Sequence, residues 1–197
     1  MSKKSIIIIV VLAIIAIFTY TKYNGMVGLS EDAKTAWSNV ESEYQRRSDL
    51  IKNLVNTVKG AADFEKSTLE AVINARAKAT STQINVDDLT PENMTKFQQA
   101  QDGLSGALSR LLVTVERYPD LKANQNFLKL QDELASTENS VRTSRNRFNK
   151  AVNDFNKSIK TFPNNLFAGM FGFKDMARFK AAAGSENAPD VEFDFSN

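Results

Sequence analysis

The chain has 197 residues, with 25 Lys and Arg against 23 Asp and Glu, and it contains no His and no Cys. Without Cys there are no disulfides, thiolate nucleophiles, zinc–thiolate sites or lipidated N-terminal cysteine. Without His the commonest general base and transition-metal ligand is missing. We therefore expect no catalytic residues, no cofactor and no metal site, and a protein that is not an enzyme. The length and composition suit one folded unit of ordinary globular character.

The N-terminal segment is apolar and predicts a membrane anchor. Residues Ile6–Phe18 are all apolar, and Ser5–Thr21 carries no charge. As a helix, this stretch spans about 26 Å, the short end for a bilayer. A cleaved signal peptide is the alternative, but Thr19–Tyr23 offers no small residues at the cleavage positions. We favour an uncleaved anchor that comprises residues 1–23, with residues 5–22 in contact with the lipid bilayer.

The charges around this segment favour an N-terminus in the bacterial cytoplasm. Lys3 and Lys4 precede the segment, whereas Lys22 follows it with Glu31 and Asp32 close behind. Because positive residues stay on the cytoplasmic side, the rest of this single-pass protein is expected to be extracytoplasmic or periplasmic. That remainder holds 22 basic and 23 acidic residues, a net charge of −1, which argues against nucleic-acid binding.

The next part of the sequence predicts one long helix. A connector with Gly25 and Gly28 leads to Ser30, which suits a helix cap. From Ser30 to Ala79 apolar or small residues, Ala61 among them, repeat with a period near 3.5, as in a helix of a bundle. We expect one continuous helix here, bent near Gly60.

Two further helices follow a polar loop over residues 81–89. Thr90, Pro91 and Glu92 provide a cap, a first-turn proline and a first-turn acid for the second helix, which is expected to end at Pro119. Asn124 or Asn126 is expected to cap the third helix, which is expected to end at Pro163. The helices alternate with short loops, so they are expected to pack antiparallel.

These patterns predict an all-α fold: an N-terminal transmembrane helix followed by an elongated antiparallel bundle of three, or up to four, helices over residues 24–184. Residues 164–179 either fold back to close the end of the bundle, which we favour, or dock on a neighbouring subunit. The acidic residues 185–197 form either an extended strand added to a partner or a disordered tail. The aromatic residues of the docking alternative are Phe167, Phe171, Phe173 and Phe179.

Some polar residues interrupt the apolar seams. Arg47, Glu65, Gln101 and Arg145 occupy seam positions, and Glu138 lies beside the third seam. A charge inside a bundle must be paired, because unpaired burial costs several kcal/mol. These residues either form a polar layer that receives a ligand or, as we favour, pair to fix the alignment of the helices.

Several motifs resemble those of the LemA family of bacterial membrane proteins, and they cover nearly the whole chain in order. Lys52 departs from the family, which often has proline there, and this favours a smooth helix. The resemblance implies a single anchor and an antiparallel helical bundle, but no established chemistry. The motifs are Arg46-Arg47-Ser48-Asp49-Leu50-Ile51-Lys52-Asn53-Leu54-Val55, Tyr118-Pro119-Asp120-Leu121-Lys122-Ala123-Asn124, Leu130-Gln131-Asp132-Glu133-Leu134, Phe162-Pro163-Asn164-Asn165 and Phe171-Gly172-Phe173.

The polar residues of these motifs are candidates for contacts between helices or for a shared partner surface. Our first functional hypothesis is a non-enzymatic scaffold of the bacterial envelope whose copies associate side by side as homo-oligomers or recruit another envelope membrane protein. The alternative is an adaptor or sensor that binds a ligand or presents clients to a membrane protease. The candidate residues are Arg47, Asp49, Asn53, Glu65, Asp120, Lys122, Asn124, Glu138 and Arg145.

Overall fold

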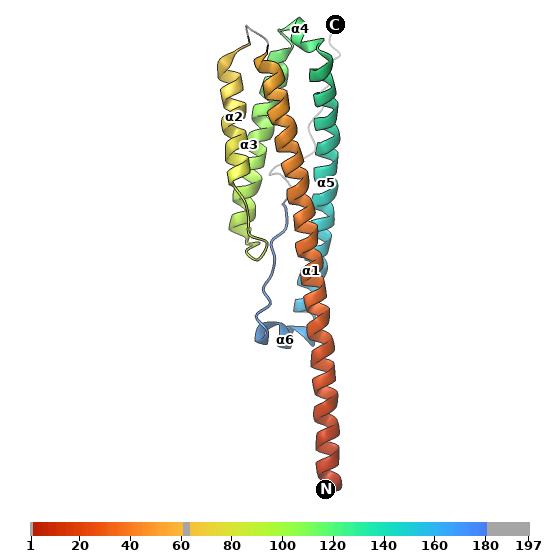
Figure 1. Cartoon of the computed structure of the whole chain (residues 1–197). Helices are drawn as coiled ribbons and strands as arrows, with labels where there is room; N and C mark the ends of the chain where they lie inside the picture. Colours follow the sequence, from red (N-terminus) through yellow and green to blue (C-terminus); the bar gives the residue numbers. More distant parts are fainter. Residues whose placement is uncertain (1, 61–63, 181–197) are drawn as a thin grey trace, which may run out of the picture.

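A computed structural model describes residues 2–60 and 64–180, and the described residues form a helical rod (Figure 1). Four long helices run up, down, up and down, so the predicted all-α fold is confirmed. α1 packs mainly on α5, and α2 packs on α3 and also on α1. The helices are α1 (Lys3–Lys59), α2 (Lys66–Ser81), α3 (Pro91–Val115), α4 (Pro119–Lys122), α5 (Gln125–Lys160) and α6 (Asn164–Met170).

The apolar N-terminal segment and the first helix of the bundle form one unbroken helix. The expected connector at Gly25 and Gly28 is wrong, because both glycines lie inside α1, and so does Ser30, which was the expected cap. A single glycine costs a helix only about 1 kcal/mol, and here the flanking residues Met26 and Ala33 are fully buried in the bundle. Within the described residues, α1 holds the one stretch that is long and apolar enough to cross a membrane, and none of that stretch is buried.

The predicted continuous helix from Ser30 to Ala79 is also wrong, because it is two helices. α1 ends at Lys59, Gly60 forms its C-cap, and α2 begins at Lys66 and runs back alongside. Apolar spacing continues through the reversal because both helices bury their apolar faces in one core, with Leu54 and Val72 in the same cluster. Periodicity alone cannot separate that hairpin from a continuous helix. Ala61, placed in the seam above, lies outside the described residues.

The predicted helix starts agree with the structure. The Thr90 hydroxyl accepts a hydrogen bond from the Asn93 N–H (3.3 Å), and Pro91 follows in the first turn of α3. The Asn124 side chain accepts from the N–H groups of Asn126 (2.9 Å) and Phe127 (3.2 Å) at the start of α5. α3 ends at Val115, somewhat earlier than expected, and Pro119 instead opens the short helix α4.

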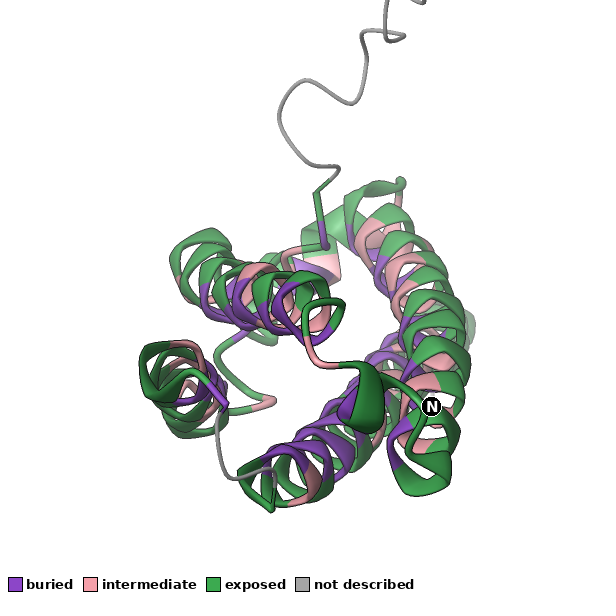
Figure 2. Ribbon diagram, turned by 90° about the horizontal axis from the view of Figure 1, so that it is seen from above, coloured by how far each residue is buried: buried purple, intermediate pink, exposed green. Residues whose placement is uncertain are grey.

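The buried residues lie on the sides of the helices that face one another, and the exposed residues lie on the outer sides (Figure 2). They form three clusters along the rod. The cluster farthest from the N-terminus includes Leu54, Leu111 and Phe127. The middle cluster surrounds Trp37, and the third joins Met26 and neighbours on α5 and α6. The core is therefore a column of layers along the helix axes.

After α6 the chain turns and runs back along the bundle as an extended segment, Phe173–Lys180, which we call the strap. Asn149 on α5 donates to the Phe179 carbonyl (3.2 Å) and accepts from the Phe179 N–H (2.9 Å). Asn156, two helical turns later, donates to the Met176 carbonyl (2.8 Å) and accepts from the Met176 N–H (3.0 Å). Side-chain amides therefore hold the strap's backbone at Met176 and Phe179, and between them the Ala177 N–H donates to the Leu89 carbonyl (2.8 Å).

The strap places Phe179 in the middle of the core. Its ring stacks on Trp37 (5.9 Å between centroids) and lies edge-on to Phe148 (5.7 Å). Residues 164–179 thus fold back onto their own bundle in this chain. The acidic segment 185–197, for which a strand or a disordered tail was expected, lies outside the described residues.

We predict that Phe179→Ala lowers the free energy of unfolding by about 3–5 kcal/mol, because a buried aromatic ring is lost from the middle layer. Thermal unfolding followed by circular dichroism in mild detergent would measure it. Phe162→Ala is the matched control, since that ring is 75% exposed. Equal effects of the two substitutions would contradict the position of the strap.

Candidate functional site

A line of polar side chains crosses the interior of the rod at the level of Arg47. Arg47 is only 4% exposed although it carries a charge. Its guanidinium pairs with Glu138 on α5 (3.2 Å) and donates a hydrogen bond to the Ser105 hydroxyl on α3. One side chain of α1 therefore connects this helix to both α5 and α3.

The same line continues to α2. Ser105 donates to the Gln101 carbonyl (3.0 Å), and the Gln101 side chain donates to the Ala79 carbonyl at the end of α2 (3.4 Å). A second link joins the Ser48 and Thr80 hydroxyls, 3.2 Å apart. All four long helices are thus joined by polar contacts at one level. We call this set the polar belt; its residues are Arg47, Ser48, Thr80, Gln101, Ser105 and Glu138.

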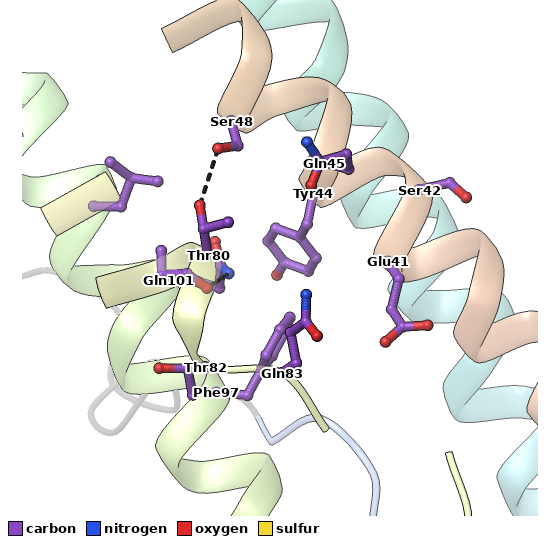
Figure 3. Close-up of a pocket in the computed structure, with 12 residues that line it drawn as sticks. Glu41, Ser42, Tyr44, Gln45, Ser48, Thr80, Thr82, Gln83, Phe97 and Gln101 are labelled. Carbon is purple, nitrogen blue, oxygen red and sulfur yellow. Dashed lines mark hydrogen bonds between the residues drawn. The ribbon is translucent and has the colours of Figure 1, made fainter. Parts of the chain in front are cut away.

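Beside the polar belt lies a pocket of about 520 Å³ between α1, the end of α2 and α3. Figure 3 shows Tyr44 and Glu41 entering from α1, with Gln83 and Gln101 opposite them. The Tyr44 ring packs edge-on against Phe97 (5.1 Å) and forms an apolar wall. The lining residues are Glu41, Ser42, Tyr44, Gln45, Ser48, Ala79, Thr80, Thr82, Gln83, Phe97, Gln101 and Leu104.

One carboxylate gives the pocket its charge. Burial raises the pKa of Glu41 above its ordinary value, and the nearby indole of Trp37 partly offsets this. Burial also raises the pKa of Tyr44, with a smaller opposing effect from Arg145, so its hydroxyl stays neutral at physiological pH. The pocket thus offers hydroxyls, amides and one carboxylate. In the described segments no three Asp or Glu residues gather as a group that could hold a metal ion.

The other predicted polar residues are dispersed along the rod. The Arg145 guanidinium lies over the Phe179 ring (4.4 Å) and so supports the strap. Asp49 accepts a hydrogen bond from Gln45 (3.2 Å) on α1 and pairs with Arg76 on α2 (3.8 Å), whereas Asn53 is exposed.

Four predicted residues lie at the end of the rod remote from the N-terminus. Glu65 is not in a helix seam, which corrects the expectation, because it is the N-cap residue of α2 and pairs with Arg117 (2.9 Å). Lys122 pairs with Glu116, and Asp120 is exposed. Asn124 caps α5. The predicted set therefore does not form a single site.

Three of the four aromatic residues of the predicted docking segment lie near the N-terminal part of α1, and the fourth, Phe179, lies in the middle core cluster. Phe167 lies against Phe18 (6.2 Å between centroids) and Phe171 against Tyr23 (4.8 Å). Phe173 reaches Tyr23 (5.9 Å) as well. Docking on a neighbouring chain stays a prediction.

Sequence reasoning missed the residues that hold the strap and line the pocket. Asn149 and Asn156 are seven residues apart, which places both on one face of α5, and that spacing was an available signal. Ser105 stands four residues after Gln101 and would share its face for the same reason. Glu41 and Gln83 carry no local pattern, because only the packing of α1 against the loop after α2 brings them together.

We predict that Arg47→Met lowers the free energy of unfolding by about 1.5–3 kcal/mol, the range for hydrogen bonds to a charged group. The measurement is thermal unfolding in mild detergent. Arg46→Met is the control, because Arg46 is the exposed neighbour on the same helix. An unchanged or raised stability of Arg47→Met would mean that apolar packing can replace the ion pair, as it does in some other buried pairs.

Comparison with known proteins places the chain in a family. The model of the LemA family matches residues 36–193. Protein LemA of Metamycoplasma hominis is 25% identical over 84% of this chain and 72% of its own length. Magnetosome protein MamQ 1 of Paramagnetospirillum magneticum is 26% identical over 89% of this chain and 72% of its own. Magnetosome protein MamQ of Magnetospirillum gryphiswaldense is 28% identical, over 86% and 69%. The family match covers most of the chain, including all of the bundle beyond the first part of α1, and the chain therefore belongs to the LemA family.

Proposed function

We propose that this protein is a non-enzymatic scaffold of the bacterial envelope, held in the membrane by its N-terminal helix and self-associating through its helical rod. Family membership and the apolar helix support a membrane-associated helical protein. Three relatives carry the name magnetosome protein, which fits a role in the organisation of a membrane. The helical domain lies outside the cytoplasm in this proposal.

The observation that carries the proposal is the continuity of α1 from Lys3 to Lys59. A stiff connection between the anchor and the bundle makes all copies in one membrane present the same faces at the same height. Association then costs less orientational freedom than it does for proteins that tumble in solution. Copies that share one orientation can form closed, symmetric assemblies.

A flexible insertion tests this reasoning. We predict that a Gly/Ser segment inserted between Asn24 and Gly25 lowers the yield of oligomers, because it uncouples the rod from the anchor. The yield is measured by amine crosslinking in cells, followed by mass determination of the extracted full-length protein.

The matched control is the same insertion between Asp87 and Asp88, in the exposed turn between α2 and α3. Equal yields for the two insertions would show that rigid coupling is not required. A strictly monomeric parent protein, in membranes and in mild detergent, would overturn self-association altogether.

The pocket beside the polar belt favours a second candidate, a sensor that binds a small polar ligand. Its one charged lining residue, Glu41, and its neutral hydroxyls and amides fit a cationic or neutral molecule with hydrogen-bond donors. The buried polar groups around it would fix the ligand's orientation. Such a ligand would bridge α1 to α2 and α3 and so stiffen the contact between them.

The single tryptophan reports on this pocket, because Trp37 lies next to Glu41. We predict that Trp37 fluorescence titrates with a midpoint above the ordinary Glu41 value of 4.5, and that Glu41→Gln abolishes this titration. A raised carboxyl pKa means that the folded state binds the proton more tightly than the unfolded chain. The stability contributed by this group therefore falls as pH rises through the folded-state pKa.

Ligand binding is then measured as a shift of that midpoint. Spermidine serves as a cationic probe and N-acetylglucosamine as a neutral one. A bound cation favours the ionised carboxylate and moves the midpoint down. Glu92→Gln is the control, since Glu92 is exposed at the start of α3. The absence of any saturable shift with either probe would count against a ligand of these classes.

A further inference from the structure

The end of the bundle nearest the N-terminus exposes a group of large apolar side chains. The exposed fractions are 75% for Phe162, 61% for Leu166, 76% for Met170 and 42% for Phe171. Leu166 and Met170 are one turn apart on α6 and so lie on one side of it. The opposite side is inward, because Ala168 is buried in the third core cluster. The outward apolar side of α6 therefore has no partner among the residues that the structure describes.

The position of this element relative to α1 is fixed by aromatic contacts. Phe167 lies against Phe18, the last residue of the apolar stretch, and Phe171 lies against Tyr23. Tyr23 is about 7.5 Å farther along the helix axis than Phe18. Figure 1 shows α6 beside α1 where the rod ends and α1 continues alone toward the N-terminus. α6 therefore sits at the level where the apolar stretch of α1 gives way to polar residues.

From these two observations we infer that residues 162–171, which we call the interfacial segment, lie in the headgroup layer of the bilayer that α1 spans. Leu166 and Met170 then contact the upper acyl chains, while Phe167 holds the segment against α1. Helices that lie in the plane of the membrane place their apolar side in this way, at the boundary between headgroups and acyl chains. Aromatic residues such as Tyr20 and Tyr23 also favour that layer.

The charges around the interfacial segment fit a lipid surface. Residues 162–171 contain no charged side chain, so their insertion requires no desolvation of a charge. Lys174 follows the segment, and Lys22 lies at the same end of the rod on α1, whereas Lys160, which precedes the segment, is paired with Asp175. Lys22 and Lys174 can keep their ammonium groups among lipid phosphates while their stems lie on apolar surface. A surface that binds a second protein chain would not require an uncharged apolar segment with lysines beside it at the level of the membrane surface.

The absence of native cysteine allows a direct test with the full chain. Met170→Cys is labelled with a nitroxide, and the protein is reconstituted in vesicles of phosphatidylcholine and phosphatidylglycerol. Collision rates are measured with oxygen, which concentrates in lipid, and with a water-soluble nickel chelate. The control is Val113→Cys, which is 71% exposed near the remote end of α3. We expect oxygen to dominate at residue 170 and the nickel chelate to dominate at residue 113.

Equal accessibility profiles at residues 170 and 113 would overturn the inference. So would shielding from both reagents together with disulfide-linked dimers of Met170→Cys, because a second copy would then cover the face. The inference rests on the anchoring part of the proposed function, so a third label at Leu12→Cys checks the span itself. A lipid-exposed label at residue 12 with a water-exposed one at residue 170 rejects the interfacial segment alone. A water-exposed label at residue 12 rejects the anchor.

Discussion

The guanidinium of Arg47 is the constraint on which the arrangement of the four helices depends. α1 packs closely on α5, and α2 packs closely on α3, so the bundle consists of two helix pairs. Arg47 reaches from the first pair into the second through Ser105 and also secures Glu138 within its own pair. Because a buried guanidinium without partners is costly, any slip of one pair along the other would be penalised at this level. The apolar layers above and below supply most of the stability but define the register less sharply.

The strap contacts both helix pairs at the level of the middle core cluster. Its Phe179 fills the middle layer between Trp37 on α1 and Phe148 on α5, and Gln98 on α3 accepts from and donates to Lys180 (3.4 and 3.1 Å). The strap is thus bound from both helix pairs. An extended segment covers the core here, as a further helix would in a larger bundle. It connects the core cluster around Trp37 to α6.

The helices and their caps could be predicted from local patterns, and the long-range features could not. Thr90 and Asn124 act within three residues of their own position, so their sequence context is sufficient. The reversal after Gly60 escaped prediction because both helices keep the same apolar spacing in one shared core. The cost of burying a charge predicted that an Arg–Glu pair would join the helices, but only the structure identifies Arg47 and Glu138 as that pair. The pocket at Glu41 depends on the packing of a loop that has no sequence pattern. Local sequence patterns therefore predicted the helices and their caps, whereas the candidate site depends on how the helices and loops pack.

The unbroken course of α1 makes the rod a lever. From Met26 to Lys59 the helix rises about 50 Å, at the standard rise per residue. Transmembrane helices tilt by amounts that depend on bilayer thickness, and a change of about 10° lies well within the range that they show. With no hinge between the anchor and the bundle, such a change would carry the remote tip of the rod sideways by about 9 Å. Small differences in membrane thickness would thereby become large displacements at the end of the rod where Glu65 pairs with Arg117.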